Sequence, residues 1–122
     1  MWRRDNREKR CATQALRRAR EFALASASTP LERAAVRDVY DTAALAVEFT
    51  GQAFHVDHRH PIKLGGSSRA ENLQHLPARM NMSKGAKTHD QALDRVDGYR
   101  AWTEQRNTFE QVTWVHQQRA HN

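Results

Sequence analysis

One stretch decides the fold: FHVDHRHPIKLGGSSRAENLQHLPARMNMSKG, residues 54–85. It opens with the alternating apolar and polar side chains of a short strand at 54–58, and a second short strand is predicted at 72–76. Between the two, Pro61 and the run GGSS at 65–68 indicate a loop. Residues 77–84 then favour a short helix that ends before Gly85. The stretch therefore predicts a strand–loop–strand–helix unit.

Two helices are predicted before this unit. Residues 6–27 are rich in Ala, Arg, Leu and Glu, which favour helix, and their apolar members recur at helical spacing. The second helix starts at Thr29, a good N-cap, with Pro30 at its first position and Glu32 completing a capping box. Gly51 is a suitable terminator for this helix.

A third long helix is predicted from Asp90 onward. Gly98 lies inside it and costs about 1 kcal/mol relative to Ala, so a kink or a break is expected there. The apolar stripe of this helix would be Leu93, Val96, Tyr99, Trp102, Phe109, Val112 and Val115.

Length and composition fit one domain. The chain has 122 residues, and domains most often contain roughly 100–150. We expect an α+β fold over residues 1–122, with a helical N-terminal part at 1–51, a core at 52–87 and a C-terminal helix at 88–122.

The positive charge is concentrated at the N-terminus. The net charge is +6, and residues 1–20 contain eight Arg or Lys against two acidic residues, whereas the remaining residues are balanced. Such a block attracts a polyanion by displacing counterions from its phosphates. The alternative is a solvated helix face that keeps the protein soluble.

Other features of the composition exclude several classes of protein. No apolar run approaches the roughly 18 residues of a membrane span, and no apolar segment follows the basic N-terminus as in a signal peptide. The single Cys11 excludes an intramolecular disulfide and a cysteine zinc site. We therefore expect a cytoplasmic protein without a membrane partner.

Segment 52–87 contains the residue types that phosphodiester hydrolysis requires. That reaction requires a base to activate water and a cation to stabilise the developing negative charge. The usual pKa of histidine, near 6.5, leaves His58 largely neutral at pH 7 and able to accept a proton. Asp57 and Asn81 offer the oxygen ligands that Mg²⁺ and Mn²⁺ prefer.

Asp57-His58, Asn72 and Asn81 follow one another in an order that resembles the HNH nuclease family, whose ββα-metal core is also called the His-Me finger. Asn72 lies 14 positions after His58, and Asn81 lies nine positions after Asn72, spacings that are usual in that family. The resemblance covers about 35 of the 122 residues. The family pattern is met in order by Asp57-His58, Pro61, Gly65-Gly66, Asn72-Leu73, Asn81 and Lys84-Gly85.

The resemblance implies a role for each matching residue. His58 would be the general base, and Asn72 would hold the loop that positions it. Asp57 and Asn81 would bind one divalent metal, Mg²⁺ or Mn²⁺. The expected nucleic-acid contacts are Lys84, Arg59, His60, Arg79 and Lys87.

Two departures from the family pattern affect the metal chemistry. Many members carry cysteine pairs for structural zinc, whereas Pro77 and Met80 stand at those positions here, so no structural zinc is expected. Colicin-type members bind metal through a further His at the position of Gly85, so a three-His site is not expected. A four-His site from His55, His60, His75 and His89 is a weaker alternative, because its spacings match no zinc motif.

The function implied is a metal-dependent endonuclease that hydrolyses DNA, one strand per active site, in the manner of small free-standing phage and bacterial members. The protein partners consistent with this are a second copy of the chain or a phage or bacterial DNA-processing protein. Two alternatives remain open: a degenerate HNH-fold module that binds DNA without cutting it, and an RNA-cleaving toxin of the same fold.

Overall fold

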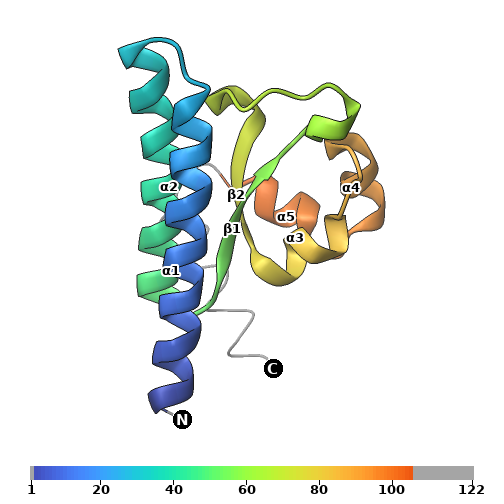
Figure 1. Cartoon of the computed structure of the whole chain (residues 1–122). Coiled ribbons are helices and arrows are strands. Elements are labelled where there is room, and N and C mark those ends of the chain that lie inside the picture. The colour runs from blue at the N-terminus through green and yellow to red at the C-terminus, as the bar shows by residue number, and fades with distance from the viewer. Residues whose placement is uncertain (1, 106–122) are drawn as a thin grey trace.

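The structure, a computed structural model, describes residues 2–105 (Figure 1). A hairpin of two long helices lies along one side of a two-stranded sheet, and three short helices lie on the other side. The elements in chain order are α1 (Trp2–Ala25), α2 (Pro30–Thr50), β1 (Phe54–His58), β2 (Leu73–Pro77), α3 (Ala78–Lys84), α4 (His89–Arg95) and α5 (Tyr99–Thr103). Two 3₁₀ turns, Ile62–Leu64 and Ala70–Asn72, lie between the strands. The fold is α+β, as expected.

The predicted ends of α2 are confirmed, with one difference at its start. The Thr29 side chain accepts a hydrogen bond from the Glu32 backbone N–H at 3.1 Å, and Gly51 closes the helix in the left-handed conformation at φ 70°. The Glu32 carboxylate, however, accepts from the backbone N–H and the hydroxyl of Ser28, both at 3.0 Å. The expected capping box is therefore only half formed, because Ser28 offers that carboxylate two donors.

The two predicted strands pair as an antiparallel ladder. Asp57 lies opposite Gln74 and His58 lies opposite Leu73. The second strand begins one residue later than predicted, because Asn72 closes the preceding 3₁₀ turn. The strand passes directly into α3, and the Ala78 backbone N–H donates to the Ala53 carbonyl at 3.0 Å. The strand–strand–helix order predicted from residues 54–85 is thus observed.

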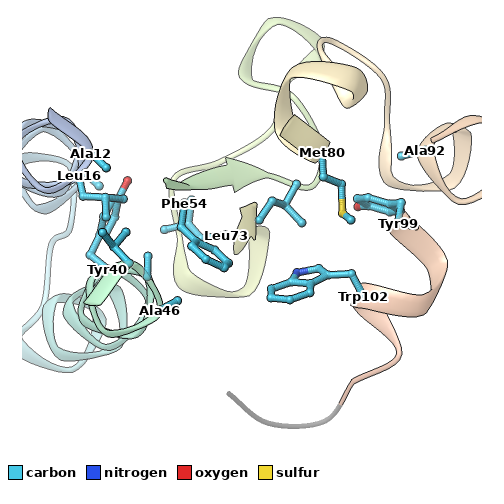
Figure 2. Close-up of a cluster of buried hydrophobic side chains, with 14 of the residues drawn as sticks. Ala12, Leu16, Tyr40, Ala46, Phe54, Leu73, Met80, Ala92, Tyr99 and Trp102 are labelled. Atoms are coloured by element: carbon cyan, nitrogen blue, oxygen red, sulfur yellow. The ribbon is translucent and has the colours of Figure 1, made fainter. Parts of the chain in front are cut away.

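The buried apolar side chains on the two sides of the sheet form one cluster (Figure 2). Phe54 is fully buried between the helical hairpin and Trp102 of α5, with ring centroids 5.8 Å apart. The Trp102 indole donates to the His75 carbonyl at 2.9 Å, which ties α5 to β2. Burial of these large side chains holds α5, which includes Tyr99, against β2.

The C-terminal part has the break that was expected at Gly98. The helical region starts at His89, α4 ends at Arg95 and α5 starts at Tyr99. Gly98 lies between them at φ 78°, a left-handed conformation that interrupts a helix. The expected stripe residues Phe109, Val112 and Val115 lie outside the described residues. In residues 2–105, no helix is both long and apolar enough to cross a membrane.

Candidate active site at the end of the first strand

An open hollow of about 440 Å³ lies where the end of β1 meets α3. Three of the residues predicted from the sequence, Asp57, His58 and Asn81, line it together. Its other lining residues are Val56, Pro61, Ile62, Lys63, Gly85 and Ala86. Adjacent strand residues usually point to opposite faces. Asp57 and His58 nevertheless share the hollow, because His58 is the last residue of β1 and the chain turns into the loop immediately after it.

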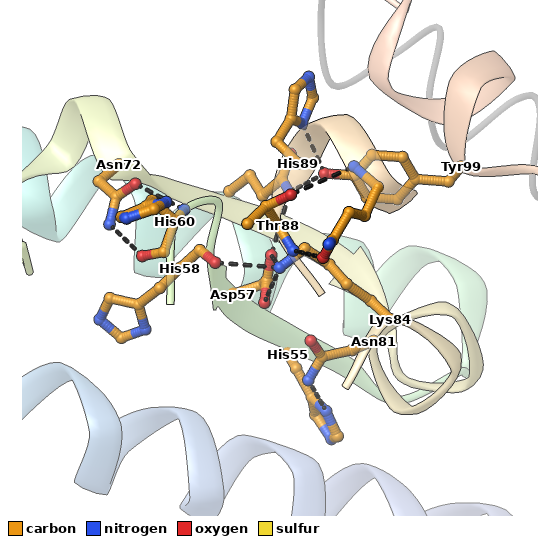
Figure 3. Close-up of polar contacts among 12 residues, drawn as sticks. His55, Asp57, His58, His60, Asn72, Asn81, Lys84, Thr88, His89 and Tyr99 are labelled. Atoms are coloured by element: carbon orange, nitrogen blue, oxygen red, sulfur yellow. Dashed lines mark hydrogen bonds and ion pairs between the residues drawn. The ribbon is translucent and has the colours of Figure 1, made fainter. Parts of the chain in front are cut away.

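Asp57 is buried and forms an ion pair with Lys84 (Figure 3). The Lys84 ammonium lies 3.1 Å from its Oδ2 and 3.3 Å from its Oδ1, and it also donates to the His58 carbonyl at 3.1 Å. The side chain of Lys84 is 0% exposed. This differs from the expectation of a phosphate contact. Burying a carboxylate without a partner is costly, and Lys84 is the cation that α3 brings to it.

A hydrogen-bonded chain extends from Asp57 toward the C-terminal helices. Gln74, opposite Asp57 in the sheet, donates to its Oδ2 at 3.1 Å and to the Tyr99 hydroxyl at 2.7 Å. That hydroxyl lies 2.7 Å from Nδ1 of His89. Sequence analysis gave Gln74 and Tyr99 no role in the site and considered His89 only for the four-His alternative. The antiparallel pairing could have identified Gln74, but no sequence signal places Tyr99 here.

His58 is half-buried and suited to accept a proton. Its Nε2 lies 3.3 Å from the Ser68 hydroxyl. Burial lowers the pKa of His58, the Asp57 carboxylate raises it, and the Lys84 ammonium lowers it, with a net decrease from the usual 6.5. The imidazole is therefore neutral at pH 7, which a general base requires.

Asn72 braces the loop that follows His58. Its Oδ1 accepts from the His60 backbone N–H at 2.9 Å, and its Nδ2 donates to the carbonyls of His60 at 3.0 Å and Ser67 at 2.7 Å. Its own carbonyl accepts from the Arg59 backbone N–H at 2.8 Å. One side chain thus joins both ends of the loop at the point where the chain leaves β1.

Gly66 allows the loop to close on itself. Its backbone N–H donates to the Pro61 carbonyl at 2.9 Å. A Cβ at this position would lie 1.8 Å from the His60 backbone oxygen, closer than any real contact. The glycine is therefore required here by the close approach of two backbone segments.

Asn81 projects from α3 at the hollow beside His55. Its Nδ2 lies 2.8 Å from Nδ1 of His55, and Figure 3 shows its amide oxygen turned away from that ring. Oxygen donors from Asp57 and Asn81 therefore line one hollow, and the donor chemistry fits Mg²⁺ or Mn²⁺. Asp57 would contribute the lone pairs that Lys84 and Gln74 leave free.

The remaining histidines of this region have separate partners. His60 Nε2 lies 2.9 Å from the Leu64 carbonyl, His75 packs against Trp102, and His89 contacts Tyr99. In the part of the chain from 2 to 105, no group of three or more His, Cys, Asp or Glu is arranged to hold a metal.

The other predicted nucleic-acid contacts lie at or near the surface. Arg59, His60 and Arg79 are exposed, whereas Lys87 is half-buried, with its ammonium donating to the Ser83 carbonyl at 3.1 Å. Lys63, which the sequence analysis did not select, is exposed and lines the hollow. Among the described residues that line the hollow, it is the only Lys or Arg.

No protein-family model, curated protein or solved structure matches this chain.

Proposed function

We propose that the chain is a metal-dependent endonuclease that hydrolyses DNA phosphodiester bonds, with a ββα-metal core of the HNH type formed by β1, β2 and α3. The observation that carries this proposal is the convergence of Asp57, His58 and Asn81 on one hollow. These residues come from two elements and are separated by up to 24 positions in the sequence. Together they combine a proton acceptor with two oxygen donors.

His58 acts as the general base in this proposal. Its lowered pKa keeps the imidazole neutral at pH 7, so it can take a proton from an attacking water. Asn72 fixes the loop that leaves His58, and Ser68 contacts its Nε2 at 3.3 Å. Asp57 and Asn81 would hold Mg²⁺ or Mn²⁺, which stabilises negative charge on the phosphate when bound.

The Lys63 cation at the hollow supports binding of a polyanion. The further contacts that we propose are Arg59, His60, Arg79 and Lys87. The basic residues of α1 would add affinity that does not depend on DNA sequence. A single metal site hydrolyses one strand, so the product expected from supercoiled plasmid is the nicked circle.

The decisive test is an incubation of the purified protein with supercoiled plasmid in Mg²⁺, Mn²⁺ or excess EDTA. Nicking in either metal and none in EDTA is expected. Asp57→Ala, purified in parallel, should nick slowly in Mg²⁺ and partly recover as Mn²⁺ is raised. Nicking that persists in excess EDTA would refute the metal assignment.

The same experiment separates the two alternatives. A degenerate DNA-binding module would shift a labelled duplex on a gel and never nick plasmid. An RNA-cleaving enzyme would degrade a folded RNA in the same buffer while it leaves plasmid intact. Either outcome would replace the proposed function.

A further inference from the structure

The carboxylate proposed to bind metal is already neutralised by the protein itself. The Lys84 ammonium contacts both oxygens of Asp57, at 3.1 and 3.3 Å, and Gln74 donates to Oδ2 at 3.1 Å. Asn81, the other proposed ligand, is uncharged. The protein side of the site therefore has no net negative charge to attract a divalent cation.

The ammonium is held firmly at this position. Lys84 is fully buried, and its third contact, the His58 carbonyl at 3.1 Å, belongs to the backbone at the end of β1. Moving the ammonium away would leave Asp57 buried without its counter-ion, a costly state. A cation that binds Asp57 must therefore share that carboxylate with Lys84.

We infer that Lys84 competes with the divalent cation for Asp57, so that the free protein binds the cation weakly and the DNA phosphate completes the site. This inference rests on the proposed function. A phosphodiester group that enters the hollow brings one negative charge and oxygen ligands of its own. Cation and DNA would then each strengthen the binding of the other by the same factor. Lys84 is in this view a residue that sets the order of binding, and it does not contact DNA.

The first arm of the test measures Mn²⁺ binding to the free protein from the loss of the free-ion EPR signal. Lys84→Met keeps the buried aliphatic stem and removes the charge, so it should bind Mn²⁺ more tightly than the wild type. Mutation of a residue that supports a metal ligand typically lowers metal affinity by about 10- to 100-fold. Lys84 instead opposes the cation, so its loss should raise the affinity, by a change of similar size. Arg37→Met, which removes one charge from the exposed part of α2, should bind Mn²⁺ as the wild type does.

The second arm leaves Lys84 in place and so does not depend on the folding of Lys84→Met. The affinity of a labelled DNA duplex is measured by fluorescence anisotropy in the His58→Ala background, in which cleavage of the duplex is slow. Added Mn²⁺ should tighten DNA binding, although its screening of phosphates acts in the opposite direction. Asp57→Ala in the same background should lose this tightening.

Two results would overturn the inference. One is a folded Lys84→Met, verified by circular dichroism, whose affinity for Mn²⁺ equals that of the wild type and of Arg37→Met. The other is a response of DNA affinity to Mn²⁺ in the His58→Ala background that equals the response of a folded Asp57→Ala in the same background. Either could occur while plasmid nicking still requires Mg²⁺ or Mn²⁺, so failure of this inference is distinct from failure of the proposed function.

Discussion

Replacement of Asn72 by Ala should affect both stability and catalysis, because one side chain holds the loop that follows the proposed base. The change removes three hydrogen bonds, one from the His60 N–H and two to the carbonyls of His60 and Ser67. Each such bond contributes about 0.5–1.5 kcal/mol net. Asn72 is half-exposed, so water replaces part of these interactions. We therefore expect a decrease of about 1.5–3 kcal/mol in the free energy of unfolding.

The rate of nicking should fall by more than the decrease in stability explains. At a temperature where the variant stays folded, the loop can still shift by a fraction of an ångström and carry His58 with it. Misplacement of a catalytic group by about 1 Å can cost about 100-fold, so a decrease of about 10- to 100-fold is expected.

Urea unfolding, followed by tryptophan fluorescence, gives the free energy, and plasmid nicking gives the rate. Glu71→Ala is the matched control, since it lies in the same 3₁₀ turn and removes only an exposed ion pair with Arg69, worth about 0–1 kcal/mol. If Asn72→Ala unfolds within about 0.5 kcal/mol of the wild type and nicks plasmid as fast, Asn72 does not brace the loop.

Three further predictions concern the loop, the pH dependence of stability and the basic helix. Gly66→Ala should lower the unfolding midpoint in urea more than Gly65→Ala does. At Gly65 the backbone is left-handed, but an added Cβ meets nothing within 4 Å. Equal midpoints for the two variants would contradict the close backbone approach at Gly66. Burial lowers the pKa of His89 in the folded protein below its usual 6.5. As pH falls, the unfolded chain therefore takes up this proton at a higher pH than the folded protein does. The free energy of unfolding decreases from about pH 6.5 down through the lowered pKa. His89→Gln should flatten the free energy of unfolding against pH in that window, and an unchanged slope would show that His89 does not contribute. The double variant Arg7→Gln with Arg10→Gln removes two exposed charges from α1. It should reduce the slope of log DNA affinity against log salt by about 0.9 for each phosphate that the helix no longer neutralises. An unchanged slope would show that α1 is solvent-exposed without binding DNA.

Local signals in the sequence predicted the helix ends and the strands. Thr29 and Gly51 bound α2 as expected, because an N-cap and a left-handed C′ glycine act over a few residues. The capping box failed at Glu32 because Ser28, one residue further upstream, offered competing donors. The apolar stripe after Asp90 continues at helical spacing across Gly98, so periodicity favoured one helix, and Gly98 was the local signal for the break between α4 and α5.

The candidate site was predictable only where residues lie close in sequence or match a family pattern. Asp57, His58 and Asn81 line one hollow, as the resemblance led us to expect of a site. The burial of Lys84 was not predictable, because it depends on how α3 packs against β1. The contact of Tyr99 with Gln74 depends likewise on where Trp102 anchors α5, and this is a tertiary effect.

The central claim, that His58 activates water for phosphodiester hydrolysis, is tested most directly by the nicking rate of His58→Ala. The variant keeps Asp57 and Asn81, so its affinity for DNA and for Mn²⁺ should remain near that of the wild type. General-base catalysis contributes about 10²- to 10⁴-fold, and the rate of plasmid nicking in Mg²⁺ should fall by that order. Purification of both proteins in parallel guards against a contaminating nuclease. Nicking by His58→Ala at the wild-type rate, or a wild type that never nicks DNA with any divalent cation, would contradict the account.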